Sequence, residues 1–83
     1  MRFSEFAEKE LIDVAGGERI GSVGQADLVI DPQTGDIRSL LLPVGNSWFG
    51  KKQGAREIAW SQIRKIGPEM VIVEGVGRSY YSR

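Results

Sequence analysis

The residues best suited to bind another molecule lie in one glycine-rich loop near the middle of this 83-residue chain. The loop spans residues 45–55 and holds two adjacent aromatic residues followed by two lysines, and an arginine comes directly after it. Aromatic side chains are enriched at the centres of protein interfaces. Aromatic rings also stack on nucleic-acid bases while lysines neutralise phosphates. The candidate partner-binding residues are Trp48, Phe49, Lys51, Lys52 and Arg56.

Several interpretations of this loop stay open at the level of sequence. It can contact another protein, stack on nucleic acid or dip into an anionic membrane surface. Alternatively, Trp48 or Phe49 folds back as a lid over the end of the domain. The formal net charge of the chain is zero, which argues against strong general affinity for nucleic acid. We therefore predict a protein partner, with a second copy of the chain as one alternative.

Catalytic and metal-binding chemistry has few candidate residues. The chain has no cysteine and no histidine, so thiolate ligands, the commonest metal ligand and the commonest general base are missing. Asp27, Asp31 and Asp36 lack the closely alternating spacing of a calcium loop. The glycines at 16–17 do not open a helix as a phosphate cradle requires. A Ser–Lys dyad is formally open, but we expect no enzyme activity, no metal and no cofactor.

Composition and length are typical of a single globular domain. Hydrophobic residues make up 41% and charged residues 27% of the chain. No apolar run approaches the ~18 residues of a membrane span. The first eleven residues carry acids where a signal peptide is apolar. We expect one domain over residues 1–83, located in the cytoplasm, with a tail that frays from about residue 76.

Short elements must position the loop. Ser4 is predicted to cap one helical turn that continues to Lys9, with Phe3 and Phe6 packed on the core. A turn at residues 15–18 and another at residues 31–36 follow strand-like runs, and glycine supplies the positive φ in each.

Alternation of apolar and small residues predicts most of the strands. Residues 20–30 alternate with period two, and we expect one strand that bends at Gly21 and Gly24. After Trp60 a second helical turn places Ile63, and as a further candidate Ile66, on the core side. Other strands are predicted at residues 11–14, 37–44, 57–60 and 70–74.

These elements amount to about five or six short strands with one or two single-turn helices. No predicted helix is long enough to form a layer of its own. Three consecutive leucines at residues 40–42 indicate that both faces of their strand are covered. We therefore predict an all-β fold closed into a small barrel, because closure removes exposed strand edges.

Five stretches of the chain together resemble a known family. They are Lys9–Val14, Gly17–Gly21, Asp27–Asp31, Thr34–Ile37 and Ile58–Gly67. They are similar to the PRC-barrel domain, and the resemblance covers about residues 3–75. The short length and the loop at residues 49–52 look closest to the stand-alone YlmC/YmxH group, whose members are linked by name to sporulation.

This resemblance implies a small PRC-type β-barrel without catalytic residues. It further implies a protein-interaction or adaptor module, associated with sporulation in a spore-forming bacterium. The alternative function that we retain is a small-barrel nucleic-acid-binding protein associated with RNA, which would use the same loop.

Overall fold

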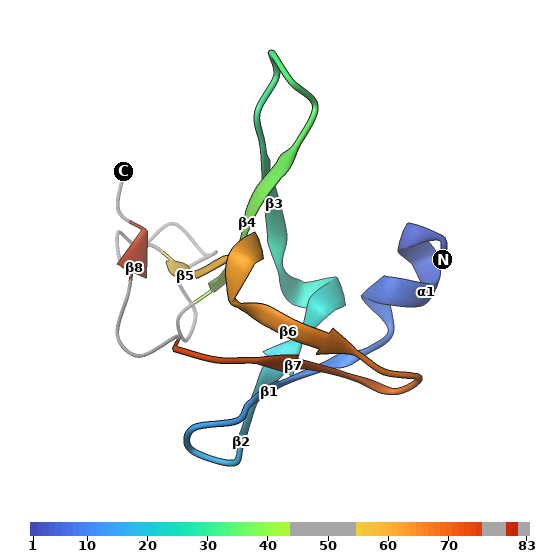
Figure 1. The fold of residues 1–83 in the computed structure, drawn as a ribbon, viewed down its shortest axis with the longest axis vertical. Helices are drawn as coiled ribbons and strands as arrows, with labels where there is room; N and C mark the ends of the chain where they lie inside the picture. Colours follow the sequence, from blue (N-terminus) through green and yellow to red (C-terminus); the bar gives the residue numbers. More distant parts are fainter. Residues whose placement is uncertain (44–54, 76–79, 82–83) are drawn as a thin grey trace.

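Short strands form two four-stranded sheets in the computed structural model, which describes residues 1–43, 55–75 and 80–81. The strand order is β2-β1-β7-β6 in one sheet and β3-β4-β5-β8 in the other (Figure 1). The strands are β1 (Glu10–Asp13), β2 (Glu18–Ser22), β3 (Asp27–Ile30), β4 (Ile37–Pro43), β5 (Ala55–Ala59), β6 (Ile63–Ile66), β7 (Met70–Val73) and β8 (Tyr80–Tyr81). The helix α1 (Phe3–Ala7) and the 3-10 turns η1 (Val23–Gln25) and η2 (Trp60–Gln62) are the other described elements. The predicted all-β fold class is confirmed.

Strand β1 pairs with one strand near it in the sequence and with another that follows much later. It pairs antiparallel with β2 and parallel with β7, so that Glu10 lies opposite Met70. In the second sheet β4 lies between β3 and β5, and Leu40 is aligned with both Leu28 and Ile58. The leucines at 40–42 are all buried, which confirms that both faces of β4 are covered.

The two predicted glycine turns are present. Gly17 has a φ of 62° and Gly35 has a φ of 83°, a region that residues with a side chain rarely adopt. The carboxylate of Asp31 accepts a hydrogen bond from the backbone N–H of Gln33 at 2.9 Å. This bond fixes the start of the β3–β4 turn.

The prediction of one bent strand over residues 20–30 is wrong. Strand β2 ends at Ser22, the η1 turn follows, and β3 begins in the other sheet. The backbone N–H of Ser22 donates to Gln25 Oε1 at 3.2 Å, and the N–H of Val23 donates to the Lys9 carbonyl at 3.0 Å. These bonds hold a corner where sequence alternation alone indicated a continuous strand. The corner is one reason why the described residues contain more strands than expected.

Gly24 lies at this corner in close contact with the end of helix α1. A β-carbon at this position would lie 2.9 Å from the carbonyl oxygen of Ala7, the last residue of α1. Such a distance is shorter than side-chain β-carbons tolerate. Glycine is therefore required if the helix is to pack closely on η1.

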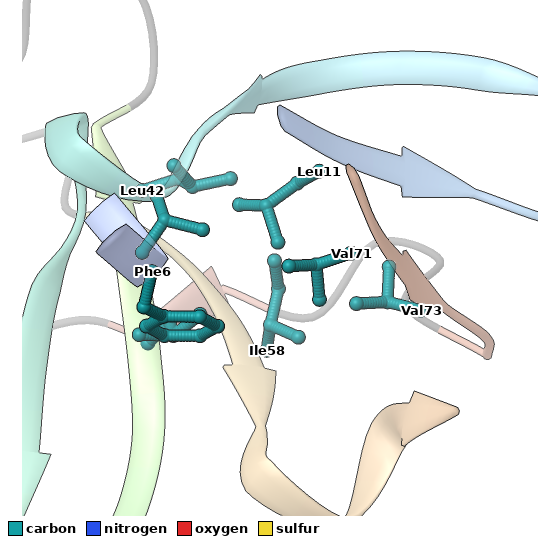
Figure 2. Close-up of a cluster of buried hydrophobic side chains, with 8 residues drawn as sticks. Phe6, Leu11, Leu42, Ile58, Val71 and Val73 are labelled. Atoms are coloured by element: carbon teal, nitrogen blue, oxygen red, sulfur yellow. The ribbon is translucent and has the colours of Figure 1, made fainter. Parts of the chain in front are cut away.

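The hydrophobic core lies between the two sheets and the helix. Its buried members come from α1, η1 and four of the strands: Phe6, Leu11, Val23, Leu40, Leu42, Ile58, Val71 and Val73. In Figure 2, Leu11 of β1, Ile58 of β5 and Val71 of β7 point toward one another. The ring of Phe6 meets the ring of Trp60 edge-on, with a centroid separation of 5.8 Å. This contact anchors α1 to the hydrophobic core.

Candidate functional site

An open, mostly apolar hollow of about 260 Å³ lies beside helix α1. We call it the α1 groove. Its lining comes from the N-terminal segment, α1, the start of β4, η2 and the end of β6: Met1, Arg2, Phe3, Phe6, Ile37, Trp60 and Ile66. In Figure 1, α1 lies to the right of the β3–β4 hairpin and above β6 and β7. Segments far apart in the sequence therefore contribute to one apolar surface.

Helix α1 presents Phe3 at this surface. Phe3 and Phe6 lie three positions apart, so they occupy the same face of the helical turn. Phe6 is buried, whereas Phe3 is 55% exposed and its ring lies 6.2 Å from that of Phe6. The prediction that Phe3 packs in the core is wrong, because Phe6 and Trp60 already fill the space beneath the helix.

The helix also begins earlier than the sequence indicated. Its N-cap is Arg2 and not the predicted Ser4. The backbone N–H of Arg2 donates to Glu5 Oε1 at 2.8 Å, and the Arg2 carbonyl accepts from Glu5 and Phe6. These bonds fix the start of the helix, where Arg2 and Phe3 line the α1 groove.

Strand β6 supplies the opposite wall. Ile63 packs against the core, as predicted, but Ile66 at the other end of the strand is 40% exposed. The expectation that Ile66 is a core residue is therefore wrong. Ile66 lies opposite Val71 on β7, where the sheet ends at the Gly67–Met70 turn and no further strand covers it within the described residues.

A second hollow of about 320 Å³ lies on the other flank of α1. Glu5, Glu8 and Glu69 line it together with Lys9 and Pro68. We call these three glutamates the acidic rim. Lys9 is buried, and its Nζ donates to the Pro68 carbonyl at 2.7 Å. The lysine thereby fixes the β6–β7 turn to the end of α1, while the glutamates remain at the surface.

Two of the three aspartates whose spacing argued against a calcium site, Asp27 and Asp31, bind the backbone. Asp27 accepts a hydrogen bond from the N–H of Leu28 at 3.0 Å. The hydrogen bond from the Gln33 backbone holds the pKa of Asp31 below its ordinary value, with help from Thr34 and Arg38. Within the part of the chain that the structure describes, no three acidic side chains are grouped as a metal site requires.

Of the five candidate partner-binding residues, the structure describes only Arg56. Trp48, Phe49, Lys51 and Lys52 lie outside the described residues, so their role stays a prediction. Arg56 is half-buried in β5, where its backbone lies between Leu42 of β4 and Tyr80 of β8. The α1 groove was missed because Phe3 and Ile66 were assigned to the core on their apolar character alone.

Comparison with known proteins matches residues 1–78 to the model of the PRC-barrel domain. The chain belongs to the PRC-barrel family. The match covers both described sheets apart from β8, so the family's domain contains the core, the α1 groove and the acidic rim. The predicted family is confirmed.

Three individual proteins show which members of the PRC-barrel family the chain is similar to. The chain is 45% identical over 76 residues to the uncharacterized protein YmxH of Bacillus subtilis, which covers 89% of the chain and 88% of YmxH. It is 36% identical over 74 residues to a Bacillus subtilis protein named "Probable sporulation protein YlmC", covering 84% of the chain and 86% of YlmC. An uncharacterized protein of Clostridium acetobutylicum is 38% identical over 69 residues, covering 80% of the chain and 75% of that protein. The predicted likeness to the YlmC/YmxH group is confirmed.

Of the described segments, none forms a helix with the length and apolar character needed to cross a bilayer.

Proposed function

We propose that this PRC-barrel chain is a non-catalytic adaptor that binds another protein in a sporulation-associated process in the cytoplasm. The observation that carries the proposal is the α1 groove, where Phe3 and Ile66 expose apolar surface on either side of the hollow. A single exposed apolar side chain needs no explanation, but several around one hollow mark a binding surface.

The size and lining of the groove favour a protein over a small ligand. Pockets for drug-sized ligands usually measure about 300–1,000 Å³ and enclose most of the ligand. The α1 groove is open and measures about 260 Å³, enough to receive side chains from a partner. Burying a Phe or Ile side chain fully contributes roughly 1.5–3 kcal/mol relative to leaving it exposed. Because Phe3 is 55% and Ile66 40% exposed, covering each would contribute about half of that amount.

The sporulation-associated role is supported by the name of the relative YlmC and by the extent of the match to it. The central loop provides a second proposed contact surface through Trp48, Phe49, Lys51 and Lys52. The loop and the groove are independent proposals about where the partner binds, and variants of each separate them.

The test is recovery of partners from sporulating cells with a tagged chain, followed by mass spectrometry. The tagged wild type should recover a specific protein, and so should the control Val14→Ser, which changes an exposed apolar residue outside the groove. The groove variants Phe3→Ser and Ile66→Ser should lose that protein. If only Trp48→Ala with Phe49→Ala loses it, the adaptor role stands and the loop is the interface.

The role in sporulation is tested separately. Cells that lack the gene should form fewer heat-resistant spores, and the wild-type gene should restore them. Unchanged spore yield together with no specific partner would overturn the proposed function.

A further inference from the structure

We infer that the α1 groove binds a basic amphipathic segment of a partner protein, with apolar side chains in the groove and lysine or arginine against the acidic rim. This inference rests on the proposed function and specifies the chemistry of the partner. It follows from the position of helix α1, which separates the apolar hollow from the hollow lined by Glu5, Glu8 and Glu69.

The acidic rim has negative charge available for a partner. Within the described residues, the carboxylates of Glu8 and Glu69 take part in neither an ion pair nor a hydrogen bond. The nearby Lys9 is buried, and its ammonium group is directed to the Pro68 carbonyl. A cation on a bound segment would therefore meet carboxylates that the fold itself does not neutralise.

The described basic residues around the groove are mostly directed elsewhere. Arg64 forms an ion pair with Glu74 at 2.6 Å, and Arg38 forms one with Asp31 at 3.5 Å. Lys65 lies opposite Ile72 on β7, whereas Ile66 lies opposite Val71. Successive strand residues point to opposite faces, so Lys65 points away from the face on which Ile66 meets the groove. Among the described side chains that line the groove, that of Arg2 is the one basic group.

This charge arrangement distinguishes among the possible occupants. An anionic membrane surface and nucleic acid would both be repelled by the acidic rim. A second copy bound through a twofold axis would use the same surface on both chains. That arrangement would bring two acidic rims together at one interface, where like charges oppose association. A partner segment with apolar and basic residues would place its apolar side chains in the α1 groove and its positive charges against the acidic rim.

Panning a random 12-residue peptide library on the purified full chain tests this inference. Enriched peptides should combine large apolar residues with net positive charge. Binding of a synthetic enriched peptide, measured by fluorescence anisotropy, should weaken at least tenfold for Phe3→Ser and for Ile66→Ser. Glu8→Lys combined with Glu69→Lys should weaken it several-fold and reduce its dependence on salt.

Matched controls lie outside both hollows. Val14→Ser removes an exposed apolar side chain and Glu18→Lys reverses an exposed charge, and both should bind the peptide as the wild type does. Because Phe3 and Ile66 are both partly exposed, their variants are expected to fold, and circular dichroism of each checks this.

Three results would overturn the inference: no enriched peptide, enriched peptides that are neutral or acidic, or equal binding by groove and control variants. A wild-type dimer in light scattering that Phe3→Ser dissociates would instead assign the groove to a second copy. A partner recovered from cells despite these results would leave the adaptor role intact and reject only the basic segment.

Discussion

Replacing Gly24 with alanine places a methyl group where helix α1 meets the η1 turn. The new β-carbon would lie 2.9 Å from the carbonyl oxygen of Ala7. Because this oxygen belongs to the backbone, relief requires a movement of the helix or of the turn. Gly24 has no positive φ, so the expected cost comes from this contact and not from backbone conformation.

Two opposing effects set how much Gly24→Ala changes the free energy of unfolding. Overpacking of a close contact typically costs about 1–3 kcal/mol, whereas the lower entropy of the unfolded chain returns about 0.4–1 kcal/mol. We expect Gly24→Ala to lower the free energy of unfolding by about 1–2 kcal/mol. For a domain of this size that corresponds to a fall in Tm of roughly 5–15 °C.

Urea and thermal unfolding monitored by circular dichroism measure this change. Gly16→Ala is the matched control, because its φ is not positive and the nearest atom to the new β-carbon is 3.7 Å away. The control should keep or slightly raise the stability. Equal or greater stability of Gly24→Ala relative to the wild type would refute the argument that α1 packs on η1 through this glycine.

Two further predictions concern polar contacts. Lys9→Met keeps the buried stem but leaves the Pro68 carbonyl without its donor; it should destabilise the fold by about 1–3 kcal/mol in urea unfolding, and an unchanged midpoint would contradict this. The pKa of Asp31 is lower in the folded state than its ordinary value of 3.8. Its contribution to stability is therefore complete well above pH 3.8 and is lost as the pH falls through the lower folded value. Asp31→Asn should lose that part of the acid dependence in urea unfolding between neutral pH and pH 2, and an identical pH profile would show that the turn does not depend on the charge.

Local chemistry made much of this fold predictable. The turns at Gly17 and Gly35 depend on positive φ, and the bond from Gln33 to Asp31 forms within one turn. These features need only neighbouring residues, so the sequence contains the information that specifies them. The run of leucines that includes Leu40 and the alternation that includes Ile58, which place both residues in the core, are equally local.

The features that the sequence did not reveal depend on distant contacts. The corner at η1 is held by the Lys9 carbonyl, which accepts from Val23, and by the close approach of Ala7 to Gly24. The parallel pairing of β1 with β7 joins Glu10 to Met70 across most of the chain. Periodicity cannot distinguish a straight strand from two strands joined at such a corner.

The candidate site likewise combines features that the sequence predicted with features that depend on distant contacts. The apolar character of Phe3 and Ile66 predicted burial, yet the core is complete without them because Phe6 and Trp60 pack together. Whether an apolar residue is buried or lies at the rim of a groove depends on which other side chains fill the core, and those side chains come from distant parts of the sequence. The Trp48–Lys52 loop remains a prediction from composition.

The central claim is that a protein partner binds at the α1 groove. Its most direct test is an NMR titration of the isotope-labelled full chain with the partner recovered from sporulating cells. Binding should shift the backbone amide signals of Phe3, Phe6 and Ile66 and leave that of Val14 unchanged. Shifts confined to Trp48–Lys52, or to Val14 and its neighbours, would contradict the claim.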